Sequence, residues 1–180
     1  MKGTFLVPIF KYGSGGSDKN LVGKLCTVLG YERGGVYANK YNFFGGKVDV
    51  GVTPVDNLLK ETEEELCLAL SDKLLDRCVL GASMVGKTMF VFAHIKGIST
   101  RKWNMIMFTR RLNIFQPWSR VEMSDIAVVP IADLATFKST SSFVQSSVGL
   151  VQGHAAKVDN AIKAGDVGVD VNYPNDLWKL

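Results

Sequence analysis

The feature that most constrains the fold is a glycine-rich segment followed directly by the start of a helix. Residues 45–51 include three glycines, and Thr53-Pro54 comes after one further residue. Threonine favours the N-cap, proline suits the first helical position, and Asp56 stands where the acid of a capping box would. The sequence therefore predicts a tight turn and then a helix from residue 54 to about residue 66.

The predicted helix carries a run of acidic residues. At 100° per residue, Glu61, Glu64 and Glu65 fall within about 100° of one another, and we expect all three on one exposed face. The neighbouring, largely apolar face, which would pack on a sheet, consists of Val55, Leu59, Thr62 and Leu66. An acidic helix face is in most proteins only solvated. The glycine loop and the Thr-Pro start at this spacing favour a more specific role.

That role is metal binding. Three carboxylates held close together repel one another unless a cation lies among them. Hard oxygen ligands clustered in this way suit Mg²⁺ or Mn²⁺, and such an ion can bind diphosphate oxygens and help to create hydroxide. The upstream glycines would let the backbone turn tightly and offer a carbonyl oxygen to the ion.

The rest of the chain has more strand-like than helical segments. Strands are predicted at Gly3–Tyr12, Lys24–Glu32, Cys78–Val85, Met89–Ile95, Asn104–Asn113 and Ile126–Pro130. Further helical segments are a short piece at Ser71–Arg77 and a C-terminal helix that follows the serine-rich stretch 139–147 and ends near Ala164. This irregular order indicates an α+β fold, and no linker divides residues 1–180, so we expect one domain.

Composition sets the class of protein and its surroundings. No apolar run approaches the ~20 residues that a membrane span requires, so we expect no membrane partner. The three cysteines are widely spaced and form no CxxC pair, which favours a reducing, cytoplasmic location. The net charge of +4 favours an anionic partner such as a polyphosphate or RNA.

The glycine loop and the acidic helix together resemble the Nudix box, a glycine loop followed by a helix with the pattern REUXEE, where U is a bulky apolar residue. Gly46 matches the first glycine of the box, and Glu61, Glu64 and Glu65 match its three glutamates. Residues 41–47 also resemble the run-up to the box. The resemblance implies a Nudix-type α/β/α sandwich with a mixed β-sheet and the loop-helix.

The resemblance also implies a Mg²⁺- or Mn²⁺-dependent hydrolase that cleaves a diphosphate linkage by attack of water. Glu64 and Glu65 would be metal ligands, Glu61 a ligand or the general base, and the Gly46 carbonyl would complete the shell.

Four positions depart from the box, none of them a metal-side carboxylate: Val52 stands in place of a glutamate, and Lys60, Thr62 and Cys67 also differ. In the family, the residues at positions 52 and 60 tend to pair, so their joint replacement leaves no unpaired charge. An active enzyme is therefore favoured over a scaffold that kept only the fold.

Other residues are candidates for contact with the substrate or for proton transfer. Some Nudix proteins take the base from a later loop, where Glu122 and Asp125 are candidates. Residues expected to contact the substrate are Arg33, Tyr37, Tyr41 and Lys47. The stretch 101–120 alternates basic and aromatic residues and would suit RNA.

The substrate class stays open: a nucleotide, a dinucleotide polyphosphate, a diphosphoinositol phosphate or capped RNA. The principal alternative is a catalytically inactive Nudix-fold module that binds RNA or a nucleotide. A homodimer is also compatible with the sequence.

A rival motif is present at Gly81–Thr88, which fits the P-loop pattern G-x-x-x-x-G-K-[ST]. A P-loop requires a helix after the motif, and residues 89–95 are strand-like instead. We therefore expect a hairpin turn at Gly86-Lys87, with Lys87 far from the scissile diphosphate.

Overall fold

The computed structural model describes residues 2–14, 18–66, 78–94 and 122–164. Several predicted features lie outside these residues: the helical piece Ser71–Arg77, the strand Asn104–Asn113, Cys67 and the basic–aromatic stretch 101–120. No helix in the described part of the chain is long and apolar enough to cross a membrane.

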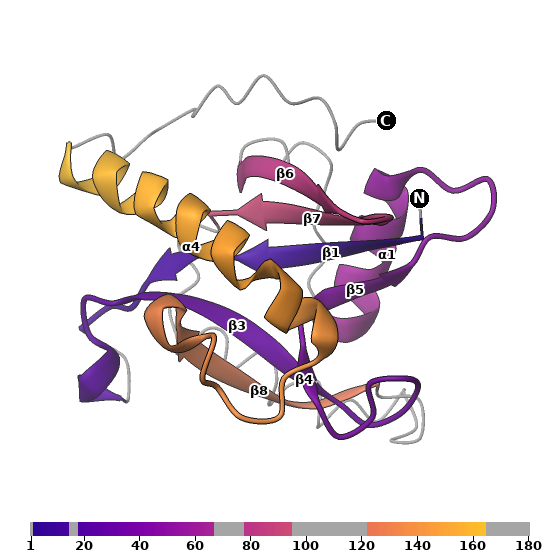
Figure 1. The fold of residues 1–180 in the computed structure, drawn as a ribbon, viewed down its shortest axis with the longest axis horizontal. Coiled ribbons are helices and arrows are strands. Elements are labelled where there is room, and N and C mark those ends of the chain that lie inside the picture. The colour runs from indigo at the N-terminus through magenta and orange to yellow at the C-terminus, as the bar shows by residue number, and fades with distance from the viewer. Residues whose placement is uncertain (1, 15–17, 67–77, 95–121, 165–180) are drawn as a thin grey trace.

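The first sheet is mixed. Its strands lie in the order β5 (Phe44–Lys47), β1 (Gly3–Pro8), β7 (Thr88–Ala93) and β6 (Val79–Val85). β1 runs parallel to β7 and antiparallel to β5, while β6 and β7 form an antiparallel hairpin (Figure 1). β5 is therefore an edge strand.

The second sheet is antiparallel. β3 (Leu25–Glu32) pairs with β8 (Met123–Pro130) along most of its length, and the two-residue strands β2 (Phe10–Lys11) and β4 (Tyr41–Asn42) also pair with β3. Short 3₁₀ helices lie at Lys19–Leu21 and Ile131–Asp133.

Two helices cover opposite faces of the first sheet. Alternate residues of β1 enter different cores: Leu6 packs with Leu58 of α1 (Pro54–Leu66), whereas Val7 packs with Val151 of α4 (Ser142–Lys163). In Figure 1, α4 crosses in front of the strands and α1 lies behind β5. This arrangement confirms the predicted α+β class and the α/β/α layering.

The start of α1 is the predicted one. The Thr53 hydroxyl accepts a hydrogen bond from the Asp56 N–H at 3.1 Å and donates one to the Asp56 carboxylate at 2.7 Å. The capping pair satisfies an otherwise free N–H and fixes where the chain leaves the glycine-rich segment.

The P-loop interpretation is excluded, because β6 and β7 flank Gly86-Lys87 and no helix follows. Gly86 takes a positive φ of 61°, as a tight hairpin turn requires. Two strands were not predicted: β4 and β5 both lie in the glycine-rich region between residues 34 and 51.

Candidate active site

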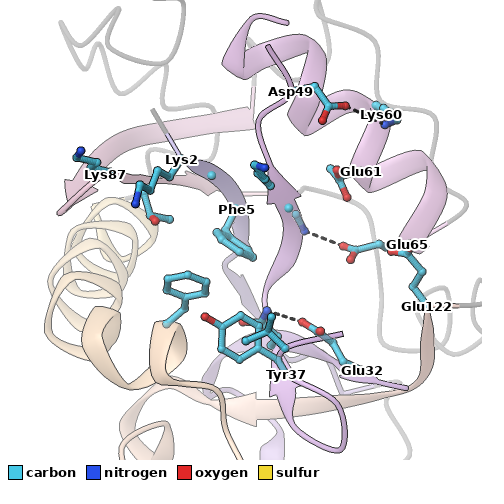
Figure 2. Close-up of a pocket in the computed structure, with 18 of the residues that line it drawn as sticks. Lys2, Phe5, Glu32, Tyr37, Asp49, Lys60, Glu61, Glu65, Lys87 and Glu122 are labelled. Atoms are coloured by element: carbon cyan, nitrogen blue, oxygen red, sulfur yellow. Dashed lines mark hydrogen bonds and ion pairs between the residues drawn. The ribbon is translucent and has the colours of Figure 1, made fainter. Parts of the chain in front are cut away.

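A cleft with a volume of about 780 Å³ opens around the edge strand β5 (Figure 2). Glu61 and Glu65 of α1 line one side of it, and the aromatic rings of Phe5, Tyr37 and Phe143 line the other. The ring of Phe143 lies 5.1 Å from that of Phe5 and 5.0 Å from that of Tyr37, so the three form a continuous wall.

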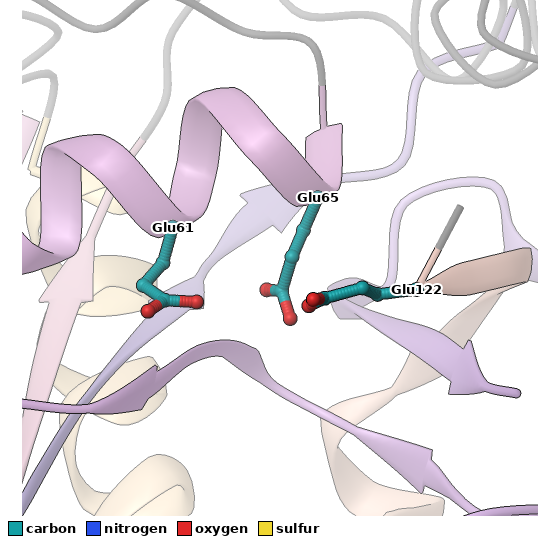
Figure 3. A group of neighbouring side chains, drawn as sticks. All are labelled: Glu61, Glu65 and Glu122. Atoms are coloured by element: carbon teal, nitrogen blue, oxygen red, sulfur yellow. The ribbon is translucent and has the colours of Figure 1, made fainter. Parts of the chain in front are cut away.

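Three carboxylates meet in this cleft (Figure 3). One oxygen from each of Glu61, Glu65 and Glu122 lies within 4.8 Å of the others. Glu61 and Glu65 are four residues apart on α1, so their side chains leave the same face. Glu122 is the residue just before β8. Its carbonyl oxygen accepts a hydrogen bond from the Arg33 N–H at 2.9 Å.

The face of α1 that carries these residues is the packed one. Leu58 and Thr62 are fully buried, Glu65 is only 4% exposed, and Glu61 is half-buried. The prediction that all three glutamates lie on one exposed face is therefore wrong. The buried face of α1 is centred near Leu58 and includes Glu65. Glu64, rotated 100° from Glu65, is exposed and lies outside the three-carboxylate group.

The glycine loop touches both helix carboxylates. The Gly45 N–H donates to Glu65 Oε2 at 2.7 Å. A side chain on Gly46 would place its first carbon 2.8 Å from the carboxyl carbon of Glu61. The Gly46 carbonyl oxygen lies against Gly3 of β1, and its role as an ion ligand stays a prediction.

The carboxylates are costly to ionise together. Burial, with the nearby charges of Glu64 and Glu122, raises the pKa of Glu61 from 4.5 to about 7. Burial raises the pKa of Glu65 well above its ordinary value, despite the opposing hydrogen bond from Gly45. A divalent cation would offset this repulsion, and three hard oxygen donors on two elements fit Mg²⁺ or Mn²⁺.

A fourth carboxylate, Glu32 at the end of β3, was not singled out from the sequence. Glu32 lines the cleft and accepts a hydrogen bond from the Asn42 side-chain amide at 2.5 Å. Burial raises its pKa, and the Asn42 hydrogen bond opposes the rise. Asn42 is itself fixed by the Ser141 hydroxyl, which donates to its Oδ1 at 2.7 Å. The Glu32 carboxylate is thus held by Asn42, which is itself held by Ser141.

Two of the departures from the Nudix box have local structural solutions. Lys60 pairs with Asp49 at 3.7 Å, which gives it a partner in place of the residue at position 52. The Thr62 hydroxyl is buried and donates within 2.9 Å of the carbonyls of Leu58 and Leu59, so no polar atom is left unpaired.

The other predicted site residues divide into two groups. Lys47 and Tyr37 line the cleft, as does Glu122 of the two late-loop candidates. Arg33, Tyr41 and Asp125 do not appear in its described lining. Tyr41 instead packs edge-on against Tyr31 and Phe137, at ring distances of 5.0 and 5.2 Å, and Asp125 is exposed on β8.

The place of Lys87 beside the cleft was not predicted, and its expected distance from the scissile diphosphate stays a prediction. Lys87 is a hairpin-turn residue, as predicted, but it lines the same cleft as Glu61, together with Lys2. The β1–β7 pairing brings the turn beside the first residues of the chain. This pairing joins segments far apart in the sequence, so it could not be predicted from the local sequence pattern. The aromatic wall was missed for the same reason, since Phe5 and Phe143 lie far apart in sequence.

Comparisons with known proteins bear on the fold. No protein-family model and no curated protein matches the sequence. Among solved structures, the Nudix hydrolase RenU from M. smegmatis matches with 12% identity and a TM-score of 0.56, over 87% of this chain and 86% of that one. An Ap4A hydrolase from C. elegans matches with 13% identity and a TM-score of 0.52, over 87% and 99%.

A third match, NrtR from Shewanella oneidensis, has 11% identity and a TM-score of 0.53 over 88% of this chain. The present chain spans 64% of the NrtR chain, and 36% of a MutT/nudix family protein from Enterococcus faecalis. These structural matches agree with the mixed sheet, the two covering helices and the loop-helix described above. The chain has the Nudix fold.

Proposed function

We propose that the protein is a Mg²⁺- or Mn²⁺-dependent pyrophosphohydrolase acting on a nucleotide-like diphosphate. The observation that carries the proposal is the meeting of Glu61, Glu65 and Glu122 within 4.8 Å in a cleft of about 780 Å³. Two of the three carboxylates come from the helix of the Nudix-like motif, and the third comes from a distant part of the chain.

The three carboxylates have different surroundings and hence different roles. Glu65 is buried and fixed by the Gly45 N–H, so it is the least mobile of the three and suits permanent ion binding. Glu61 and Glu122 are more accessible, and either can take the proton of the attacking water. The ion, when bound, would neutralise the diphosphate and make its water more acidic.

The far side of the cleft supports a nucleotide-like substrate. Tyr37 and Phe143 are partly exposed, with the buried ring of Phe5 packed against Phe143, and they offer ring surface on which a base can stack. Such a contact is worth about 1–3 kcal/mol in other proteins. The C. elegans Ap4A hydrolase, which shares the fold, is a precedent for such a substrate. A cytoplasmic location and a homodimer stay predictions.

A second candidate function is binding without catalysis. NrtR, which shares the fold, has also been solved in complex with a 27mer DNA. The departures at Val52 and Lys60 would fit a chain that has lost hydrolysis. The retained carboxylate trio is the reason to rank the enzyme first.

The test is a hydrolysis screen with and without Mg²⁺ or Mn²⁺ on nucleotides, dinucleotide polyphosphates, diphosphoinositol phosphates and capped RNA. We expect metal-dependent release of two phosphorylated products from at least one class. Glu65→Gln should abolish that activity, whereas Glu63→Gln, a matched change on the exposed side of α1, should not. Tight binding of a nucleotide or RNA with no turnover in any metal would favour the binding module.

A further inference from the structure

Three lysines line the cleft near the first residues of β1, and the proposed carboxylate chemistry uses none of them. Lys2, Lys47 and Lys87 all line it. The Lys2 N–H donates to the Lys87 carbonyl at 2.7 Å, and Lys47 lies opposite Gly3 in the β5–β1 pairing. Neighbouring strands are about 4.8 Å apart. The lysine cluster, as we call these three residues, therefore comes from three backbone segments that lie side by side.

The lysine cluster lacks a counter-charge within the described part of the chain. Lys60, the other lysine of the cleft, pairs with Asp49 at 3.7 Å. None of the three clustered lysines forms an ion pair with a described carboxylate, and all three are exposed. Like charges held side by side repel each other, and an anion among them would relieve that repulsion.

Lys2 and Lys87 of the lysine cluster are separate from the carboxylates. In Figure 2, Lys2 and Lys87 lie on one side of β5 and Glu61 and Glu65 on the other, with Phe5 between them. Along β1, Lys2 is two residues from Thr4, which pairs with Gly46 beside Glu61. Two residues of strand and one side-chain length put the two ends on the order of 10 Å apart. One phosphate cannot contact both ends.

We infer that the lysine cluster is a phosphate-binding subsite, and that the substrate is a nucleotide with at least one phosphoryl group beyond the scissile diphosphate. The substrate assignment rests on the proposed function, whereas the anion site does not. Lysine suits this role because its ammonium is a compact charge with three rotatable donors. Lys87 would then contact phosphate through its side chain, without the backbone cradle and following helix of a P-loop.

The first experiment measures anion binding without catalysis. Inorganic tripolyphosphate is titrated into the metal-free protein by calorimetry, since the unneutralised carboxylates then repel the probe and leave the lysines to bind it. The double variant Lys2→Gln/Lys87→Gln should bind at least tenfold more weakly. The control Lys24→Gln/Lys138→Gln removes the same charge from exposed positions outside the described cleft lining and should stay within about twofold of the wild type.

Equal weakening in both double variants would show that only net charge matters and would overturn the subsite. Unchanged binding in Lys2→Gln/Lys87→Gln would overturn it as well. A circular dichroism melt of each variant shows that loss of binding is not loss of fold.

The second experiment tests the substrate assignment by kinetics. A substrate that the wild type hydrolyses is compared with a matched one that lacks the additional phosphoryl group. Lys2→Gln/Lys87→Gln should raise KM at least tenfold for the longer substrate, with kcat and the KM of the shorter one little changed. A uniform rise for both substrates would refute the assignment. If the wild type hydrolyses nothing, the proposed function fails, and the tripolyphosphate titration still decides whether the lysine cluster binds phosphate.

Discussion

The substitution Glu65→Gln tests whether the carboxylate cluster lowers the stability of the folded protein while it is required for turnover. Glu65 is 4% exposed, and its Oε2 accepts the Gly45 N–H at 2.7 Å. Glutamine has nearly the same volume, and its Oε1 can accept the same hydrogen bond. Its amide N–H groups can donate to the carboxylates of Glu61 and Glu122, whose oxygens lie within 4.8 Å. The substitution thus removes one charge with little change in packing.

The expected stability change follows from that loss of charge. Two charges within 4.8 Å of each other repel by about 3.5 kcal/mol or more at an effective dielectric constant of 20. The native cluster already avoids part of this cost, because burial raises the pKa of Glu65 and the pKa of Glu61 and keeps protons bound. Solvent screens the rest, so we expect a net gain of about 1–2 kcal/mol, or about 2–8 °C in Tm for a chain of this size.

The assay compares thermal melts in EDTA at pH 8 with hydrolysis rates in Mg²⁺. Glu65→Gln should melt higher than the wild type while turnover falls by at least a hundredfold, about 2.7 kcal/mol in the barrier. Mg²⁺ should stabilise the wild type, by about 2.7 kcal/mol at 100 times its Kd, and stabilise the variant much less. Glu63→Gln is the control. A variant that melts lower yet hydrolyses normally would refute the reasoning, and Glu61→Gln, at a more accessible site, gives a second reading.

Three further predictions test the geometry of the site. Gly46→Ala should fold but lose at least tenfold in turnover, because the methyl group displaces only the flexible tip of Glu61. Gly45 has a φ of 142°, and a carbon added there would lie 2.1 Å from a β1 carbonyl oxygen. Gly45→Ala should therefore lose more than about 2 kcal/mol of stability, measured by chemical denaturation. Metal-free protein should lose stability as pH rises from 4.5 to 7, because folded Glu61, with its pKa raised to about 7, retains a proton that the unfolded chain releases. Since Glu61 is half-exposed we expect its share to be about 1 kcal/mol, or about 2–4 °C in Tm. The pH dependence should be smaller by that amount in Glu61→Gln, where Glu65 and Glu32 still contribute, and an undiminished pH dependence in the variant would contradict the prediction. Glu122→Gln should lower turnover in Mg²⁺ more than Glu64→Gln does. The reverse order would indicate that the metal ligands are the three glutamates matched by the motif and not the three that meet in space.

The parts of the fold that could be predicted are those whose signals are local. The Thr53-Pro54 start of α1 and the turn at Gly86 depend on residues within a few positions of each other, and both were predicted correctly. The strands β4 and β5 were not predicted, because Tyr41–Asn42 and Phe44–Lys47 have no alternating or β-branched pattern. These segments are strands because they pair with β3 and β1, and those pairings are set by the tertiary fold.

The candidate site follows the same division. The sequence placed Glu61 and Glu65 beside the glycine loop, because the spacing between loop and helix is short and fixed. It gave Glu122 only as one of two alternatives and missed Glu32 altogether. Those two residues lie at adjacent ends of β8 and β3, so their proximity depends on the antiparallel register of strands about 90 positions apart. No pattern within a single segment reports that register.

The motif on α1 includes three glutamates, but only two of them meet at one point. Glu64 is left out, and Glu122 takes its place in the carboxylate group. Residues four apart on a helix lie nearly above one another, so Glu61 and Glu65 can aim at the same place. Glu64 lies about 60° from Glu61 on the side away from Glu65; it is exposed, and its charge raises the pKa of Glu61. A third close ligand must therefore come from outside the helix. The residue just before β8 supplies it here, since the Arg33 N–H donates a hydrogen bond to the Glu122 carbonyl oxygen and holds that backbone at the edge of the cleft. The carboxylate trio is thus a property of the packed sheet and helix together, and a variant that shifts β8 against α1 should lose the site even with every glutamate in place.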